Sequence, residues 1–196
     1  MRSFEGFYNC GNVGESQILR YRHPDVHKSG VVTTFKGGLI TARHVAQGQN
    51  IPNFTTHQTL DIAYRPDDSI RGLPLGWVDV WGLDAELVTT SVENPDRVVS
   101  VLGHIGITLA PTDLLPFDPH KRTEHEQYIK PGASGSPLVY DNHIIGILPG
   151  RIAAASGHDE LTPGRAMAVV FNGEHMKEAM EHFGLTLPAR PLIGID

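Results

Sequence analysis

Ser134 stands between two glycines, Gly132 and Gly135, just before the apolar run that begins at Leu138. A hydroxyl that attacks a carbonyl group must be held clear of its own backbone, and two N–H groups must converge on the oxygen that becomes negative. Glycine on both sides of a serine permits both conditions, because it tolerates the backbone angles of a tight loop. The segment is a candidate nucleophile loop for acyl transfer, although a plain glycine and serine turn before a strand has the same letters.

A candidate base lies in the first half of the chain, where His44 follows Thr41-Ala42-Arg43 at the end of a predicted strand. A serine hydroxyl is a poor nucleophile until a base removes its proton, and imidazole has an ordinary pKa that suits this task near neutrality. The chain has 11 histidines, most of which we expect to be solvated surface residues. The placement of His44 at the end of a strand, with the serine loop in the other half, singles it out.

Short strands must position these groups, because apolar and polar residues alternate over most of the chain. In the first half the pattern predicts strands at 17–21, 31–35, 39–41, 59–64, 77–81 and 85–90, and in the second half at 97–102, 105–109, 126–130, 137–140, 143–148 and 165–171. Gly37-Gly38 and Asp141-Asn142 are typical of hairpin turns. The segment 91–96 reads as a linker, which predicts two β-domains at 1–92 and 93–196.

One helix is predicted, over about 173–183. Asn172 can cap its start and Gly184 its end. Four apolar residues fall on one face and indicate core packing: Met176, Ala179, Met180 and Phe183. The expected fold is therefore all-β, with two packed six-stranded antiparallel β-barrels and a C-terminal α-helix.

Taken together, the two strings resemble those of the chymotrypsin-like (trypsin-fold) serine peptidases, in which a TA-x-HV string supplies the base and a G-x-SG-x-P string the nucleophile. The chain order, His44 before Ser134, agrees with that family. The resemblance implies two β-barrels with the catalytic groups in the cleft between them. It implies that the protein is a serine endopeptidase working through an acyl-enzyme intermediate. His44 would be the general base, Ser134 the nucleophile, and the N–H groups of Gly132 and Ser134 the oxyanion hole.

Two departures from the digestive members refine the resemblance. Ala133 stands where those members carry an acidic residue that pairs with a freed N-terminus, so zymogen activation of that kind is not expected. The chain has one cysteine, Cys10, and therefore no internal disulfide. These features look more like the compact virus-encoded members, which implies polyprotein processing. The alternatives are an intracellular bacterial trypsin-like peptidase, or an inactive peptidase fold used as a binding module.

The family also requires a carboxylate that orients the histidine, and three candidates compete. Asp84 leads because it opens the alternating string Asp-Ala-Glu-Leu-Val and leaves room for a hairpin between itself and His44. Asp61, in Asp-Ile-Ala-Tyr, matches the family in letters but follows His44 so closely that two strands barely fit between them. Asp79 ranks third, because Trp81 and Gly82 follow it where small and apolar residues are usual. The expected triad is His44, Asp84 and Ser134.

By the same analogy, the substrate side-chain pocket is lined near Tyr128, Ile129, Leu148 and Ala168. None of these residues carries a charge. An unpaired buried charge is costly, so the pocket is expected to disfavour Lys or Arg and to accept an apolar or medium polar side chain. The other reading of these positions is that some of them belong to the core.

Charge and composition limit the partners. Lys and Arg total 16 against 22 Asp and Glu, a net charge of −6, so no nucleic-acid partner is expected. No apolar stretch is long enough to predict membrane insertion. A single cysteine indicates an intracellular protein, in the host cytoplasm if it is viral. The expected partner is a polypeptide substrate, which includes the chain's own precursor if the tail 185–196 ends at a cleavage point.

No metal ion or organic cofactor is expected. Two histidine pairs are candidate metal ligands, His23 with His27 and His120 with His125. Pro24 interrupts any helix that would bring the first pair to one face, and the second pair lies in a charged segment without a clear third ligand.

Overall fold

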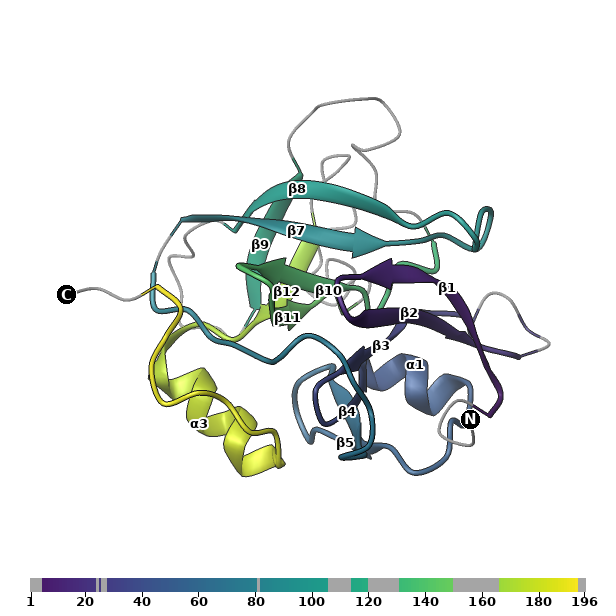
Figure 1. Cartoon of the computed structure of the whole chain (residues 1–196), viewed down its shortest axis with the longest axis horizontal. Coiled ribbons are helices and arrows are strands. Elements are labelled where there is room, and N and C mark those ends of the chain that lie inside the picture. Colours follow the sequence, from purple (N-terminus) through teal and green to yellow (C-terminus); the bar gives the residue numbers. More distant parts are fainter. Residues whose placement is uncertain are drawn as a thin grey trace.

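Two antiparallel sheets of six strands each form this protein, in a computed structural model that describes residues 5–23, 25, 28–80, 82–105, 114–119, 131–149 and 166–193 (Figure 1). Neighbouring strands of the first sheet are, in spatial order, β1 (Phe7–Val13), β2 (Ser16–Tyr21), β3 (Val32–Phe35), β4 (Gly38–Thr41), β6 (Ala63–Pro66) and β5 (Thr55–Thr56).

The second sheet closes into a barrel. Its strands follow one another in the order β10 (Pro137–Tyr140), β11 (His143–Ile147), β12 (Ala166–Val170), β9 (Leu114–Pro119), β8 (Val99–Ile105) and β7 (Leu83–Thr89). Pairing of Leu138 with Leu87 joins the last strand to the first. The expectation of two closed barrels is thus met only in part, because no pairing between the described residues of β1 and β5 closes the first sheet.

The two sheets do not divide the chain at residue 92 as expected. Strand β7 precedes that residue, yet it pairs with β8 along its whole length and with β10, so it belongs to the barrel. Alternation of apolar and polar residues predicts a strand but does not say which sheet it joins. The first sheet therefore ends at β6, and β7 opens the second.

Local signals predicted several elements correctly. The β3–β4 hairpin forms as predicted, but its turn is Lys36-Gly37 and not Gly37-Gly38, with Phe35 paired to Gly38 and Gly37 at φ 122°. Asp141 and Asn142 both have positive φ, 47° and 56°, as a tight β10–β11 turn requires.

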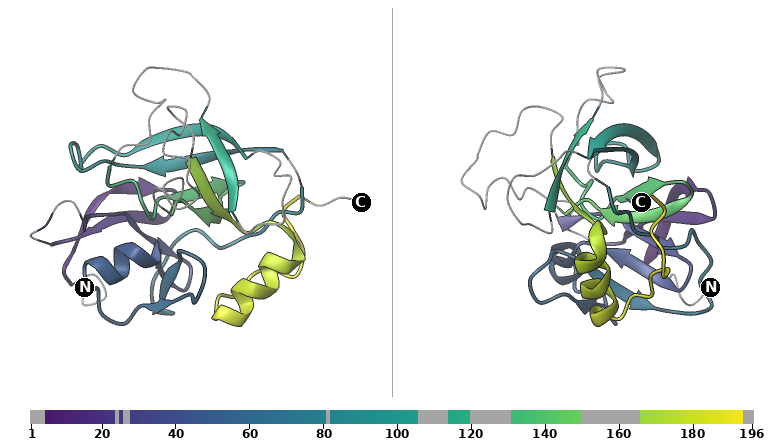
Figure 2. Two further views of the ribbon diagram at one scale, coloured as in Figure 1. Left: turned by 180° about the vertical axis from the view of Figure 1, so that it is seen from behind. Right: turned by 90° about the vertical axis from the view of Figure 1, so that its left-hand side faces the viewer.

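The predicted C-terminal helix is also present, as α3 (Gly173–Phe183). Gly184 ends it in the left-handed conformation, with φ 116°. Met176 and Met180 are buried, and the ring of Phe183 packs edge-on against Tyr64 of β6. Figures 1 and 2 show the helix beside the first sheet, away from the barrel strands β7 and β8.

Other elements differ from the sequence expectation. Residues 77–80 form no strand; they belong to an extended linker, with single bridges from Leu75 to Ile144 and from Val78 to Asn172. The sequence pattern did not predict β1, β5, β9 or the short helix α1 (Arg43–Gly48). The predicted strand at 126–130, most of the one at 105–109, and His27, His120 and His125 lie outside the described residues.

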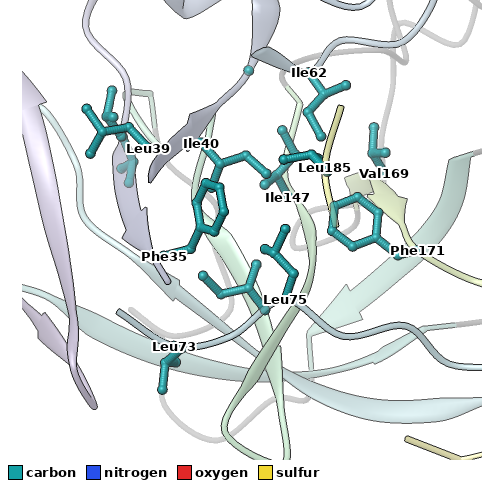
Figure 3. Packing of buried hydrophobic residues seen from close by; sticks show 14 of the residues in the cluster. Phe35, Leu39, Ile40, Ile62, Leu73, Leu75, Ile147, Val169, Phe171 and Leu185 are labelled. Carbon is teal, nitrogen blue, oxygen red and sulfur yellow. The ribbon is translucent and has the colours of Figure 1, made fainter. Parts of the chain in front are cut away.

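One apolar core joins the two halves. Phe35, Leu39 and Ile40 of the first sheet belong to the same buried cluster as Ile147 and Phe171 of the barrel side (Figure 3). Ten of its buried members are labelled there: Phe35, Leu39, Ile40, Ile62, Leu73, Leu75, Ile147, Val169, Phe171 and Leu185. A second cluster fills the interior of the barrel. The His44 segment is therefore anchored to the first cluster through Ala42 and Val45, and the Ser134 loop to the second through Ala133.

Candidate active site

His44 lies at the point where β4 ends and α1 begins. Ala42 is the extended residue before the helix, and Val45 and Ala46 on the following turn are buried. These apolar neighbours fix the helix to the core, while the His44 side chain itself keeps half of its surface exposed. The ring is thus held by its backbone and still accessible to a substrate.

Asp61 is the carboxylate that contacts His44. In the antiparallel pair β4–β6, Thr41 lies opposite Ala63, so the residues just after β4 lie beside those just before β6. Oδ2 of Asp61 lies 2.6 Å from Nδ1 of His44, and Oδ1 accepts the backbone N–H of His44 at 2.9 Å. The two contacts fix both the position and the rotation of the imidazole, and they leave its Nε2 unengaged by Asp61.

The β5–β6 loop that carries Asp61 is itself tied to α1. Nη1 of Arg43 donates to the carbonyl oxygens of His57 and Gln58, at 2.9 and 3.0 Å. Within the loop, Nδ1 of His57 accepts the N–H groups of Thr59 and Leu60. The loop that presents the carboxylate is therefore fixed both by α1 and by hydrogen bonds within the loop.

These contacts also set the charge of Asp61. Burial of the carboxyl group opposes its ionisation, but hydrogen bonds from the ring and backbone of His44 outweigh that effect. The charges of His44 and Arg43 act in the same direction. The net result is a pKa of Asp61 below its ordinary value, so this side chain is an anion at neutral pH.

The expected contact between Asp84 and His44 is wrong. Asp84 lies on β7 opposite His104 of β8, and its Oδ1 is 2.8 Å from Nδ1 of that histidine. It therefore belongs to the barrel, on the half of the molecule opposite His44. Asp79, the third candidate, lies in the extended linker, where its N–H donates to the carbonyl of Ile193.

The Ser134 loop packs against the strands that precede His44. The carbonyl of Ser134 accepts the N–H of Val31 at 2.7 Å, and the hydroxyl of Thr41 donates to the carbonyl of Val31 at 2.6 Å. A Cβ added to Gly135 would lie 2.0 Å from Val31 O and 2.6 Å from Thr41 Oγ1. Gly135 also has φ 90°, so the close approach of the loop depends on glycine at this position.

His44 and Ser134 therefore lie on facing segments. A Cβ added to Gly30 would touch both Val45, the neighbour of His44, and the carbonyl oxygen of Ser134. Among the described residues, no hydrogen bond joins the Ser134 hydroxyl to the His44 ring. In free enzymes such bonds are often long, and they tighten when substrate binds.

The loop leaves two N–H groups for a ligand. The described residues supply no acceptor for the N–H of Gly132 or of Ser134, whereas the N–H of Gly135 donates to Leu148 and that of Ser136 donates to Ala133. Gly132 has φ 91°. The pair can serve as the oxyanion-binding donors that the resemblance implies.

Ser136 supports the loop from within, a role that sequence reasoning missed. Its hydroxyl is fully buried and lies 2.8 Å from Thr89 Oγ1 and 2.5 Å from the carbonyl of Ala133. A second serine two positions after a candidate nucleophile was the available signal, but its partner on β7 could not be read from spacing.

Two of the four expected pocket residues can be placed. Leu148 and Ala168 are 2% and 0% exposed and belong to the apolar cluster inside the barrel. The backbone of Leu148 also forms hydrogen bonds with the Ser134 loop, through Gly135 and Ser136. Tyr128 and Ile129 lie outside the described residues. A substrate-binding role for these four positions stays a prediction.

Within the described ranges, no three His, Cys, Asp or Glu side chains lie close enough together to hold a metal ion. No helix in this part of the chain has the length and apolar character needed to cross a membrane.

Comparison with known proteins gives no match by sequence: no protein family matches the chain, and neither does any curated protein. Solved structures do match. An inactive cysteine-to-alanine mutant of the murine norovirus NS6 protease, carrying a C-terminal extension, has a TM-score of 0.50 at 15% identity, over 87% of this chain and 95% of that one.

Two further structures were found. The NS6 protease from murine norovirus 1 has a TM-score of 0.48 at 15% identity, over 91% of this chain and 96% of that one. Deg5 has a TM-score of 0.49 at 12% identity, over 72% and 78%. At these identities the likeness to the first structure concerns the fold alone: the chain has the fold of a chymotrypsin-like protease.

Proposed function

We propose that the protein is a serine endopeptidase in which Ser134, His44 and Asp61 form the catalytic triad. One observation carries the proposal: Asp61 holds His44 by both its ring and its backbone, just after β4, on the segment that faces the Ser134 loop. The double contact, through ring and backbone, fixes the imidazole with its Nε2 free of the carboxylate, as a general base requires, and the Asp61 side chain is only 19% exposed. The single cysteine, Cys10, is buried in the first sheet, which leaves Ser134 as the nucleophile.

The geometry supports the following reaction. Asp61 accepts the Nδ1–H of His44, so Nε2 carries a lone pair and can take the proton of Ser134. Oγ of Ser134 then bonds to the carbonyl carbon of the substrate, and the N–H groups of Gly132 and Ser134 bind the oxygen that becomes negative. Asp61 stabilises the imidazolium that forms.

Collapse of this intermediate completes acylation. His44 passes its proton to the leaving nitrogen, the C–N bond breaks, and the acyl group stays on Ser134. A water molecule then attacks the ester, giving its proton to His44, and the ester bond breaks. His44 returns that proton to Ser134, which restores the enzyme.

The test is cleavage of a library of internally quenched peptides, with products identified by mass spectrometry. We expect the wild-type protein to cut internal peptide bonds, while Ser134→Ala and His44→Ala cut at background rate. The same library tests the expectation of an uncharged substrate pocket. At the residue on the N-terminal side of the cleaved bond, apolar or medium polar side chains should be preferred over Lys and Arg. A folded wild-type protein that cleaves no peptide would contradict the proposal.

We also propose that the natural substrate is a viral polyprotein, which the peptidase would process. Its support is the likeness in fold to a norovirus protease, together with Ala133 and the single cysteine, which resemble the compact virus-encoded members. The test is a precursor in which the chain is joined to its natural neighbours. A Ser134→Ala precursor that still releases its natural ends would refute self-processing.

A further inference from the structure

Arg20 on β2 is a fully buried arginine that crosses from the first sheet to the nucleophile loop. Its side chain is 1% exposed. Nη2 donates to the carbonyl of Gly132 at 2.9 Å, and Nη1 donates to Oγ of Ser29 at 2.9 Å. Arg20 is thus a charged group in direct contact with the residue that offers one of the two oxyanion-binding N–H groups.

Among the described residues, no ion pair compensates this charge. Within the same part of the chain, Nε of Arg20 has no hydrogen-bond partner. Burial lowers its pKa, an effect opposed by the neighbouring Cys10 and Tyr8. A buried charge held only by neutral groups is unfavourable for folding, and an apolar side chain of similar length would avoid that penalty.

The nucleophile loop needs an external support of this kind. Gly132 has φ 91°, and glycine by itself favours no single orientation of the adjoining peptide groups. Ala133, the next residue, is buried in the apolar interior of the barrel, so its side chain offers no charge to anchor the loop.

Two hydrogen bonds instead fix the two peptide groups on either side of the Gly132 Cα. The carbonyl of Pro131 accepts the N–H of Val92, and because the peptide is planar and trans, the Gly132 N–H points the opposite way. The Arg20 contact fixes the following peptide group, between Gly132 and Ala133. A hydrogen bond from a charged donor is about twice as strong as a neutral one, which makes Arg20 the stronger of the two supports.

We propose that Arg20 is a positioning residue: by fixing the carbonyl of Gly132 it restricts rotation of this residue, and so keeps the Gly132 N–H in the orientation that binds the oxyanion. This inference rests on the proposed peptidase function. Arg20, which belongs to β2 of the first sheet, would fix the conformation of the loop through its hydrogen bond to Gly132. Formation of the active loop would then depend on correct packing of the two sheets.

The experiment measures the rate at which a fluorophosphonate probe modifies Ser134 in Arg20→Met, Arg20→Lys and the matched control Arg22→Met. Arg22 is exposed on the same segment and contacts the ring of Tyr8, away from the loop. We expect Arg20→Met to slow labelling about 100-fold, the effect of losing one oxyanion donor. Arg20→Lys should lie between this variant and the wild type, because lysine reaches only one acceptor. Arg22→Met should label at the wild-type rate.

A second readout separates loop positioning from general damage. The proton between His44 Nδ1 and Asp61 is expected to give a low-field NMR signal, and Arg20→Met should retain it. Labelling of folded Arg20→Met at the wild-type rate would overturn the inference, and so would loss of the low-field signal, because the defect would then lie in the triad.

Two further outcomes are an Arg20→Met variant that does not fold and a wild-type protein that does not react with the probe. If Arg20→Met does not fold, the decision rests on Ser29→Ala, which keeps the charge and frees one end of the guanidinium. Labelling should then slow several-fold, and an unchanged rate in folded Ser29→Ala would overturn the inference. Failure of the wild-type protein to label at Ser134 would instead refute the peptidase function itself.

Discussion

Replacement of Asp61 by asparagine is the sharpest test of the triad. Both carboxylate oxygens of Asp61 accept hydrogen bonds from His44, one from the ring Nδ1 and one from the backbone N–H. An asparagine has only one oxygen. Whichever way its amide is turned, an NH₂ group must face one of the two donors of His44.

The magnitude follows from the tautomer. If the asparagine oxygen keeps the backbone contact, its NH₂ faces Nδ1, so the ring is driven to carry its proton on Nε2. That nitrogen can then no longer accept the proton of Ser134. Loss of the correct tautomer in a serine triad lowers kcat about 10⁴-fold, which corresponds to roughly 5 kcal/mol of transition-state stabilisation.

The chain offers a matched control in Asp84→Asn. The pair of Asp84 and His104 also joins a carboxylate to Nδ1, but its side chains are 57% and 47% exposed. An exposed pair contributes little, so activity should stay within about twofold of wild type. The assay is kcat/KM for a peptide found in the library screen. Equal activity of Asp61→Asn and wild type, or a larger loss in Asp84→Asn, would refute the reasoning.

Two further predictions concern the supports of the site. Gly135→Ala should abolish labelling of Ser134 and lower the thermal midpoint, because its Cβ would lie 2.0 Å from the Val31 carbonyl at a positive φ, a strain of about 1–3 kcal/mol before the clash is added. Gly48→Ala, where nothing lies within 4 Å of the added Cβ, should leave labelling intact; equal midpoints for the two variants would argue against the close packing. The pKa of Asp61 is lowered on folding from 3.8, so its contribution to stability should be complete above that value and be lost as the pH falls through the lower folded value. Denaturant unfolding between about pH 2 and 6 should show this loss in the wild type and not in Asp61→Asn; parallel pH profiles would contradict the assigned shift.

Local chemistry made part of the site and fold predictable. Asp141-Asn142 forms its turn because both residues tolerate positive φ, and Gly184 ends α3 for the same reason. The structure also places the segments of His44 and Ser134 beside each other, an arrangement that the family resemblance implies; their catalytic roles stay predictions. In each case the signal lies within a few neighbouring residues.

The sequence did not predict which carboxylate contacts His44 or which sheet β7 joins, because tertiary packing decides both. The string from Asp84 alternates as a strand should, but its apolar residues, such as Leu87, face the barrel interior and not the first sheet. By sequence Asp61 is a weaker candidate than Asp84, because two full strands barely fit between it and His44. Helix α1 occupies the residues after His44 and β5 is only two residues long, so no full hairpin has to fit.

The central claim is that His44 activates Ser134, and mapping of a covalent adduct tests it most directly. Wild-type protein, Ser134→Ala and His44→Ala are treated with a fluorophosphonate, digested and sequenced by mass spectrometry. The account predicts one adduct, on Ser134, in the wild type only. A folded wild-type protein without that adduct, or equal modification of Ser134 in His44→Ala, would contradict it.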